Sequence, residues 1–240
     1  MQSNGCESGV ASRSPPAGTR TARQSLLLLV TGTVLTVFAA GLAMADPVNK
    51  RATPASGNAR GAGHAVLFDE GPSNSKGRQY PGSVTWRTDR VEAAGQPPQI
   101  VVHAEVEIPD LKMKMRMDFK QNNDKSLPAS HTVELAFAMP GDVEGGGVIS
   151  VPGLLMKFGE RERGVPLAGL AVKVANGNFL VGLSNVAADR EHNLQLLRER
   201  RWIDIPMVYA NQHRGILAIE KGYHGEDVFR TAMEAWEQPR

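Results

Sequence analysis

Alternation between apolar and polar residues is the clearest pattern in the chain, and it is strongest between residues 100 and 120. Residues 100–108 read IVVHAEVEI, and residues 111–120 read LKMKMRMDFK. In both runs the apolar residues recur at every second position, which is the period of a strand that buries one of its faces. The two runs therefore predict an antiparallel hairpin with one apolar face and one ionic face.

A short connection at residues 109–110 would set which residues of this hairpin face each other. It places Val106 opposite Met113 and Glu105 opposite Lys114, so that apolar residues meet apolar residues and opposite charges meet each other. A shift by one residue would turn every apolar side chain to the ionic face. The face assignment holds for any connection whose length differs by two residues, because side chains alternate with a period of two.

The ionic face of this hairpin has two interpretations. Most of its charges meet opposite charges in the expected register, so a solvated face of ion pairs is the simpler interpretation. Arg116 and Lys120 lack an acidic partner in that register. They are therefore the candidate residues for the alternative, a surface that binds a polyanion.

Similar runs predict further strands before and after the hairpin. The run over residues 148–156 is interrupted by Pro152 and Gly153, which is typical of an edge strand or a bent strand. Near the C-terminus the order of strand, turn, strand and helix occurs twice. The expected strands outside the hairpin cover residues 65–68, 83–88, 131–139, 148–156, 165–174, 179–183, 202–209 and 215–220.

Two helices are expected near the C-terminus. The first runs from residue 184 or 185 to about residue 201, with Val186, Leu194 and Leu197 facing the core. The second covers about residues 226–237, and its apolar residues recur at i, i+3, i+4 and i+7, which is typical of a helix buried on one side. These apolar residues are Phe229, Ala232, Met233 and Trp236.

The elements together predict an α+β fold for residues 65–240, which form a single domain rich in β-strands. An antiparallel sheet precedes and accompanies the two helices near the C-terminus. A β-sandwich or a flattened barrel is the expected arrangement of the sheet, because each strand has to bury one face against another layer.

The N-terminal part of the chain predicts passage across a membrane. Residues 26–45 contain no charge, and the basic segment of residues 1–25 precedes them. One interpretation is a signal peptide cleaved after Ala45, since Ala43 and Ala45 form a small-x-small cleavage site. The other is an uncleaved transmembrane anchor, for which twenty apolar residues suffice. Cleavage is favoured, and both interpretations place the domain outside the cytoplasm, in the periplasm or anchored in the inner membrane.

Composition narrows the function classes once the export segment is set aside. The chain has 27 basic and 25 acidic residues, and residues 1–45 hold three of the basic residues and one of the acidic residues. The remainder is formally neutral, so a nucleic-acid partner is not expected. Cys6, the only cysteine, lies before the apolar segment. Thiolate chemistry and disulfides are therefore excluded from the domain, and residues 46–64 are expected to be a disordered linker.

Several stretches of the domain resemble a family of bacterial envelope proteins that has no assigned activity. They are GSVTWRT, LPASHTVELAF, RGVPLAGLAVKV, FLVGLSN, DREHNLQLLRERRWIDIPMVY and ILAIEKG, and together they cover about residues 65–238. The resemblance implies an exported or membrane-anchored domain. It brings no activity and no site residues with it.

His131 is the histidine with the most interesting neighbourhood in the sequence. It starts an expected strand, follows Ser130, and comes shortly after a loop that contains Asp124 and Ser126. A serine–histidine–aspartate arrangement could be drawn from these residues, but such a triad depends on spatial geometry. A histidine bonded locally at a strand end is the simpler interpretation. The histidines show no metal-ligand spacing, and no catalytic residue, metal or cofactor is assigned.

Three arginines near the end of the first helix are candidate binding residues. Cations at this position interact favourably with the helix dipole, which accounts for them without any partner. They could also dock a protein or lipid head groups if the anchor is retained. These residues are Arg198, Arg200 and Arg201.

Three functions are compatible with these observations. The first is a non-catalytic envelope protein, exported or membrane-anchored, that binds another protein, a second copy of itself or an envelope component. The second is a carrier of a small apolar ligand, because methionine-rich strand faces adapt to irregular shapes. The third is a hydrolase that uses His131 with a nearby serine.

Overall fold

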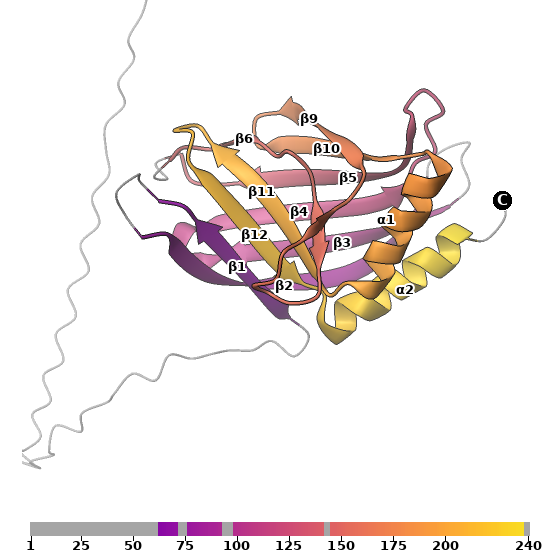
Figure 1. Cartoon of the computed structure of the whole chain (residues 1–240), viewed down its shortest axis with the longest axis horizontal. Helices are drawn as coiled ribbons and strands as arrows, with labels where there is room; N and C mark the ends of the chain where they lie inside the picture. Colours follow the sequence, from indigo (N-terminus) through magenta and orange to yellow (C-terminus); the bar gives the residue numbers. More distant parts are fainter. Residues whose placement is uncertain (1–61, 72–75, 93–97, 142–144, 238–240) are drawn as a thin grey trace, which may run out of the picture. The chain divides into compact units, whose positions relative to one another are not determined.

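The computed structural model describes residues 62–71, 76–92, 98–141 and 145–237 (Figure 1). These residues belong to one compact unit, which covers Pro54–Arg240. The basic segment of residues 1–25, the apolar segment of residues 26–45 and most of the expected linker lie outside the described residues. The first strand begins at Gly63, two residues before the predicted start of the domain. Among the described residues, no helix is both long and apolar enough to cross a membrane.

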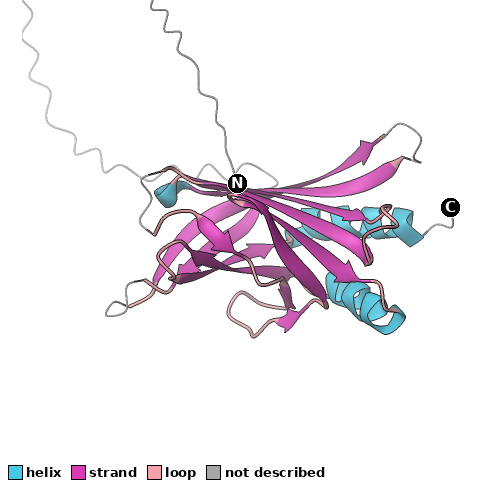
Figure 2. Cartoon of the chain, turned by 90° about the horizontal axis from the view of Figure 1, so that it is seen from above, coloured by secondary structure: helices cyan, strands magenta, loops and turns pink. Residues whose placement is uncertain are grey.

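Twelve strands form one antiparallel sheet in the described part of the chain, and the sheet curls into a half-barrel (Figures 1 and 2). The order across the sheet is β8-β7-β11-β12-β1-β2-β3-β4-β5-β10-β9, and β6 also pairs with β11. The predicted α+β class is thus confirmed. The strands are β1 Gly63–Asp69, β2 Arg78–Val91, β3 Gln99–Ile108, β4 Met113–Gln121, β5 Ala129–Ala138, β6 Val148–Ser150, β7 Leu155–Lys157, β8 Val165–Pro166, β9 Gly169–Ala175, β10 Asn178–Ser184, β11 Trp202–Tyr209 and β12 Arg214–Glu220.

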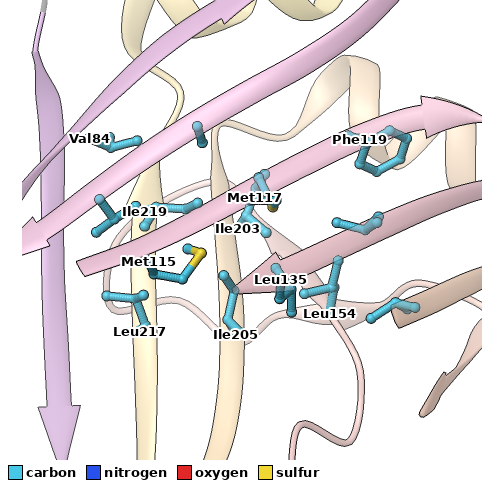
Figure 3. Close-up of a cluster of buried hydrophobic side chains, with 14 of the residues drawn as sticks. Val84, Met115, Met117, Phe119, Leu135, Leu154, Ile203, Ile205, Leu217 and Ile219 are labelled. Carbon is cyan, nitrogen blue, oxygen red and sulfur yellow. The ribbon is translucent and has the colours of Figure 1, made fainter. Parts of the chain in front are cut away.

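The core fills the concave side of the half-barrel. The apolar positions of β4 all turn inward, and Figure 3 shows Met115 and Met117 among side chains that include Ile203 and Leu217 of β11 and β12. Each of these side chains is almost completely buried. Burial of one side chain of this size stabilises the fold by about 1.5–3 kcal/mol, so the alternating pattern is a main source of stability.

The hairpin of β3 and β4 has the predicted faces but not the predicted register. Val106 lies opposite Met115, and Glu105 lies opposite Arg116, which is a shift of two residues from the expectation. The reason is a longer connection: Pro109–Leu111 form a 3₁₀ turn, and Lys112 adopts a left-handed conformation with φ of 48°. Two-residue hairpin turns need a positive φ at their first central position, which a proline cannot adopt.

Two of the long apolar runs are divided in the structure. The run over residues 148–156 becomes β6 and β7, with Pro152 and Gly153 between them. The run over residues 165–174 becomes the two-residue β8 and the seven-residue β9. Periodicity alone does not show such breaks, because the residues between the strands are apolar too.

The two predicted helices are present at one end of the half-barrel (Figures 1 and 2). Helix α2, Gly222–Glu237, starts four residues earlier than expected and buries its whole predicted apolar stripe. Helix α1, Ala187–Glu199, buries Leu197 and leaves Leu194 half-buried. Val186 was predicted to face the core, and this prediction is wrong. The helix begins at Ala187, so Val186 lies before it as an extended residue with 59% of its surface exposed.

A buried lysine joins the two helices. The Nζ of Lys221 donates a hydrogen bond of 2.5 Å to the carbonyl oxygen of Leu197, near the end of α1. The same ammonium lies 4.7 Å from the centre of the Phe229 ring of α2. Burial lowers the pKa of Lys221 to about 8. Because this bond satisfies one of the free carbonyls at a helix C-terminus, it holds the end of α1 against the start of α2.

Candidate functional site

A cleft of about 740 Å³ opens where α1 and the end of α2 meet the ends of β4 and β5. Three kinds of side chain line it. Leu194, Met233 and Trp236 form an apolar wall, Arg190 and Arg198 supply positive charge, and His131 lies at the strand end. Its size is typical of sites for small molecules, which measure about 300–1,000 Å³.

The turn between β4 and β5 is shaped by the side chain of Asn122. Its amide nitrogen donates hydrogen bonds to the carbonyl oxygens of Asp124, Leu127 and Ala129, at 3.0, 3.0 and 2.8 Å. These bonds satisfy backbone groups that a loop otherwise leaves without partners. The turn therefore enters β5 in a defined conformation, with Ser130 and His131 at the edge of the cleft.

His131 is a buried histidine with one bonded and one free nitrogen. Its Nδ1 lies 3.2 Å from the Oγ of Ser130, whereas its Nε2 has no hydrogen-bond partner among the described residues. Its ring lies 5.0 Å from the ring of Trp236 and 6.0 Å from that of Phe119, measured between centres. Burial, and to a lesser degree the charge of Arg190, lowers its pKa to about 4. The imidazole is therefore neutral at pH 7.

The two arginines of the cleft differ in their pairing. Arg198 forms an ion pair with Glu237 of α2, at 2.5 Å. Arg190, in contrast, forms no ion pair with any residue that the structure describes, although it is exposed and faces the same space. Glu191 also borders the cleft. Arg190 is thus the cation that remains available to a ligand.

Arg190 was missed by the sequence interpretation, although a signal for it exists. Arg190, Leu194 and Arg198 are spaced at i, i+4 and i+8, which places them on one face of a helix. The sequence interpretation grouped Arg198 with its neighbours Arg200 and Arg201 instead. Grouping the residues by helical face would have placed Arg198 with Arg190.

The N-terminus of α1 contributes to the polar side of the cleft. Asn185 and Ala187 border it, and free N–H groups in the first turn of a helix favour an anion. No side-chain oxygen caps this helix, because its N-cap residue is Val186. The Oγ of the preceding Ser184 accepts a hydrogen bond from the N–H of Val186 and donates one to Asp189. The carboxylate of Asp189 therefore offsets part of the positive potential at this helix end.

The serine–histidine–aspartate arrangement that could be drawn from the sequence is not assembled. Asp124 accepts a hydrogen bond of 2.6 Å from the hydroxyl of Ser126, which lowers the pKa of this carboxyl group. Neither residue contacts His131 in the described part of the chain. Ser130, on the other hand, lies next to His131 and donates a long hydrogen bond of 3.4 Å to the carbonyl oxygen of Leu183. The histidine therefore has a serine neighbour but no carboxylate to orient it.

Arg116 and Lys120 both have acidic partners, so the prediction that they lack them is wrong. The Nε of Arg116 lies 3.3 Å from Asp118, and the Nζ of Lys120 lies 2.5 Å from Glu134 of β5. Asp118 lies two residues along the same face of β4, so the sequence pattern already contained this partner, whereas Glu134 is supplied by the neighbouring strand β5. The polyanion-binding interpretation loses the unpaired charges on which it depended.

The same ionic face continues over β2 and β3. His103 lies between two carboxylates, with its Nδ1 2.6 Å from Asp118 and its Nε2 3.1 Å from Asp89. Arg87 contacts both Asp89 and Glu105, at 3.2 and 2.9 Å. The convex face over β2 to β5 is thus a network of opposite charges, as the simpler interpretation of the alternating pattern predicts.

Arg200 and Arg201 lie outside the cleft. The guanidinium of Arg200 stacks over the ring of Phe158, 3.6 Å from its centre. Arg201 forms an ion pair of 3.2 Å with Glu226 of α2. Of the six predicted binding residues, the structure therefore brings only His131 and Arg198 together.

Comparison with known proteins identifies no relative of this chain. No protein-family model, no curated protein and no solved structure matches the chain. The resemblance to envelope proteins therefore stays a prediction. Within the described residues, no group of three or more metal-ligating side chains is present.

Proposed function

We propose that this chain is a non-catalytic envelope protein, exported or membrane-anchored, that binds an anionic envelope component in the cleft between its two helices. The compartment rests on the apolar segment of residues 26–45. The observation that carries the binding function is Arg190, a cation that borders the cleft beside apolar side chains and forms no ion pair with the described residues.

The chemistry of the two walls defines the ligand class. Leu194 is half-buried and offers apolar surface to a hydrocarbon or ring, and Met233 and Trp236, only 3% and 7% exposed, border the same cleft. Arg190 and the first turn of α1 favour a carboxylate or phosphate, since both groups accept charge-assisted hydrogen bonds. A ligand with an anionic group and an apolar body could contact the cationic and the apolar residues of the cleft at the same time. A purely apolar ligand, as in the carrier hypothesis, would leave Arg190 without a partner.

Removal of the Arg190 charge is the direct test. The full chain, reconstituted in lipid nanodiscs, is titrated with octanoate by calorimetry. Arg190→Ala is expected to lower the affinity by about tenfold or more, because a charge-assisted hydrogen bond contributes about 1.5–3 kcal/mol. Arg161→Ala serves as the matched control, since the Arg161 side chain is 82% exposed and does not line the cleft. Equal affinity in all three proteins, or no binding, would contradict the proposal.

A hydrolase is the second candidate, and the contact between Ser130 and His131 favours it. A neutral histidine within 3.2 Å of a serine hydroxyl can act as its base. The orienting carboxylate of a triad has no counterpart here, and the Ser130 hydroxyl is directed to a backbone carbonyl. Labelling of the full chain by a fluorophosphonate, abolished in both Ser130→Ala and His131→Ala, would establish the hydrolase in place of the binding protein.

A further inference from the structure

The two edges of the sheet differ in how well they resist pairing with another strand. One edge is formed by β6 and β8, which are three and two residues long, and β8 ends in Pro166, which cannot donate a hydrogen bond. β9 is the other edge, and it reads GLAVKVA over seven residues with one charge, Lys173. Short strands and prolines protect an edge, whereas long apolar edges invite pairing. β9 is therefore the unprotected edge of the described sheet.

β9 also exposes apolar side chains on the convex face. Leu170, Val172 and Val174 are 72%, 46% and 66% exposed. Val172 lies opposite Leu180 of β10, so the apolar surface continues onto the next strand. A shallow hollow of about 420 Å³, bordered by Val174 and Leu180, extends it further. Contiguous apolar surface of this kind marks an interaction site on a soluble domain.

The backbone of β9 indicates which residues could pair with a new strand. The carbonyl oxygen of Ala168 accepts a hydrogen bond of 2.9 Å from the N–H of Ser184, so this position is directed to β10. Hydrogen-bonding direction alternates along an antiparallel strand. The backbone groups of Leu170 and Val172 are then directed to β10 as well, and those of Ala171 and Lys173 are directed outward to the free edge.

We infer that β9 pairs with β9 of a second copy of this chain, antiparallel about a two-fold axis at Val172. In this register Leu170 lies opposite the partner's Val174, and Val172 lies opposite the partner's Val172, so apolar side chains meet on the convex face. Lys173 lies opposite the partner's Ala171, which keeps the two lysines from facing each other directly. The outward backbone groups of Ala171 and Lys173 then form the hydrogen-bonded pairs. One sequence thus satisfies both sides of the contact, as a two-fold interface requires.

This inference goes beyond the proposed function and does not depend on the cleft. The cleft lies at the helices, whereas β9 is the free edge beyond β10. A failure of octanoate binding therefore leaves the pairing of β9 unaffected, and the reverse also holds.

Cysteine cross-linking in intact envelopes tests both the pairing and its register. In the full chain with Cys6→Ser, Val172→Cys is expected to form a disulfide dimer under mild oxidation. The reason is that the two α-carbons of a non-hydrogen-bonded pair lie about 4.5 Å apart, within the range of a disulfide. Lys173→Cys, on the same strand but on the opposite face, is the matched control and should stay monomeric.

Co-expression of two different cysteine variants tests the register more directly. Leu170→Cys and Val174→Cys should each stay monomeric alone, and should form a mixed disulfide when two differently tagged copies are co-expressed. Val172→Lys should abolish dimers of the otherwise native chain in amine cross-linking, while circular dichroism shows an unchanged fold. A monomeric Val172→Cys chain would overturn the inference, whether its thiol reacts with maleimide or is shielded by another segment or protein. Dimers from Lys173→Cys would overturn the register.

Discussion

At the scale of single residues, two of the buried polar groups of this domain lie where the helices meet the sheet. His131 and Lys221 are both almost completely buried, and burial lowers the pKa of each. Lys221 has a carbonyl partner, whereas the Nε2 of His131 has none among the described residues. An unpartnered buried nitrogen costs stability. Its presence at the cleft is consistent with a site that a ligand completes.

Acid should destabilise the domain through His131. The folded state keeps this histidine neutral down to pH 4, whereas the unfolded chain protonates it below about pH 6.5. The unfolded state thus binds more protons between these values, so stability falls as the pH decreases through that window. The loss should approach about 3 kcal/mol at pH 4, from 1.36 kcal/mol for each pKa unit.

Urea unfolding of the native chain and of His131→Phe, at pH 7 and at pH 4.5, checks this expectation. Carboxylates titrate in both proteins, so the difference between the two proteins isolates the histidine. The native chain should lose about 2–3 kcal/mol more than the variant, in proportion to the pKa shift. An equal loss in both proteins would show that His131 titrates normally in the folded state.

At the scale of secondary-structure elements, short connections decide which side chains become neighbours. The connection between β3 and β4 is two residues longer than the shortest hairpin, and this moves Met115 opposite Val106 and Lys114 opposite Glu107, with which Lys114 forms an ion pair of 2.6 Å. The side chains keep their faces, because the shift equals the period of the strand. The loop therefore sets the ion pairs, while the alternation of the strands sets the core.

The left-handed residue of that connection should be sensitive to β-branching. Lys112 has a φ of 48°, a conformation that costs a non-glycine residue about 1–2 kcal/mol. Lys112→Val is expected to destabilise the domain by at least about 1 kcal/mol, because branching at Cβ crowds this conformation further. Lys112→Asn should be neutral or slightly stabilising, since asparagine tolerates it. Thermal unfolding compares the two, and equal midpoints would contradict the expectation.

At the scale of the whole domain, the half-barrel depends on its helices to cover the end of the core. Helix α2 contributes an apolar stripe, and its Trp236 donates a hydrogen bond of 2.9 Å to the carbonyl oxygen of Ile100. The ring of Trp86 of β2 lies 5.4 Å from that of Phe229 of α2, measured between centres. The helix therefore packs against the neighbouring strands β2 and β3, and the core without it would be open to water.

Truncation of the α2 stripe should show this dependence. Phe229→Ala removes a ring that is 1% exposed and contacts the rings of Trp86 and Phe119. The expected loss is about 3–5 kcal/mol in the free energy of unfolding. Tyr223→Ala, on the same helix with 95% of its surface exposed, should change stability by less than about 0.5 kcal/mol. Chemical denaturation distinguishes them, and similar losses would mean that α2 packs differently.

The spacing at which apolar residues recur explains how much of the fold could be predicted from the sequence alone. The period of two determined the buried methionines of β4, and the period of 3.6 determined the buried face of α2. Both patterns are local, because the hydrophobic effect favours apolar side chains on one buried side of an element, whichever element packs against that side. The α+β class and the antiparallel sheet follow from the order of these elements.

Contacts between residues that are far apart in the sequence were decided only by the tertiary structure. The cleft brings His131 of β5 next to Arg190 of α1 and Trp236 of α2, and no local pattern links these three residues. The partner of Lys120 is likewise Glu134 of a neighbouring strand. Such contacts depend on loop lengths and on how far the sheet curls, which are properties of the whole packed chain. The sequence determined which side chains leave water, and the tertiary structure decided which of them meet.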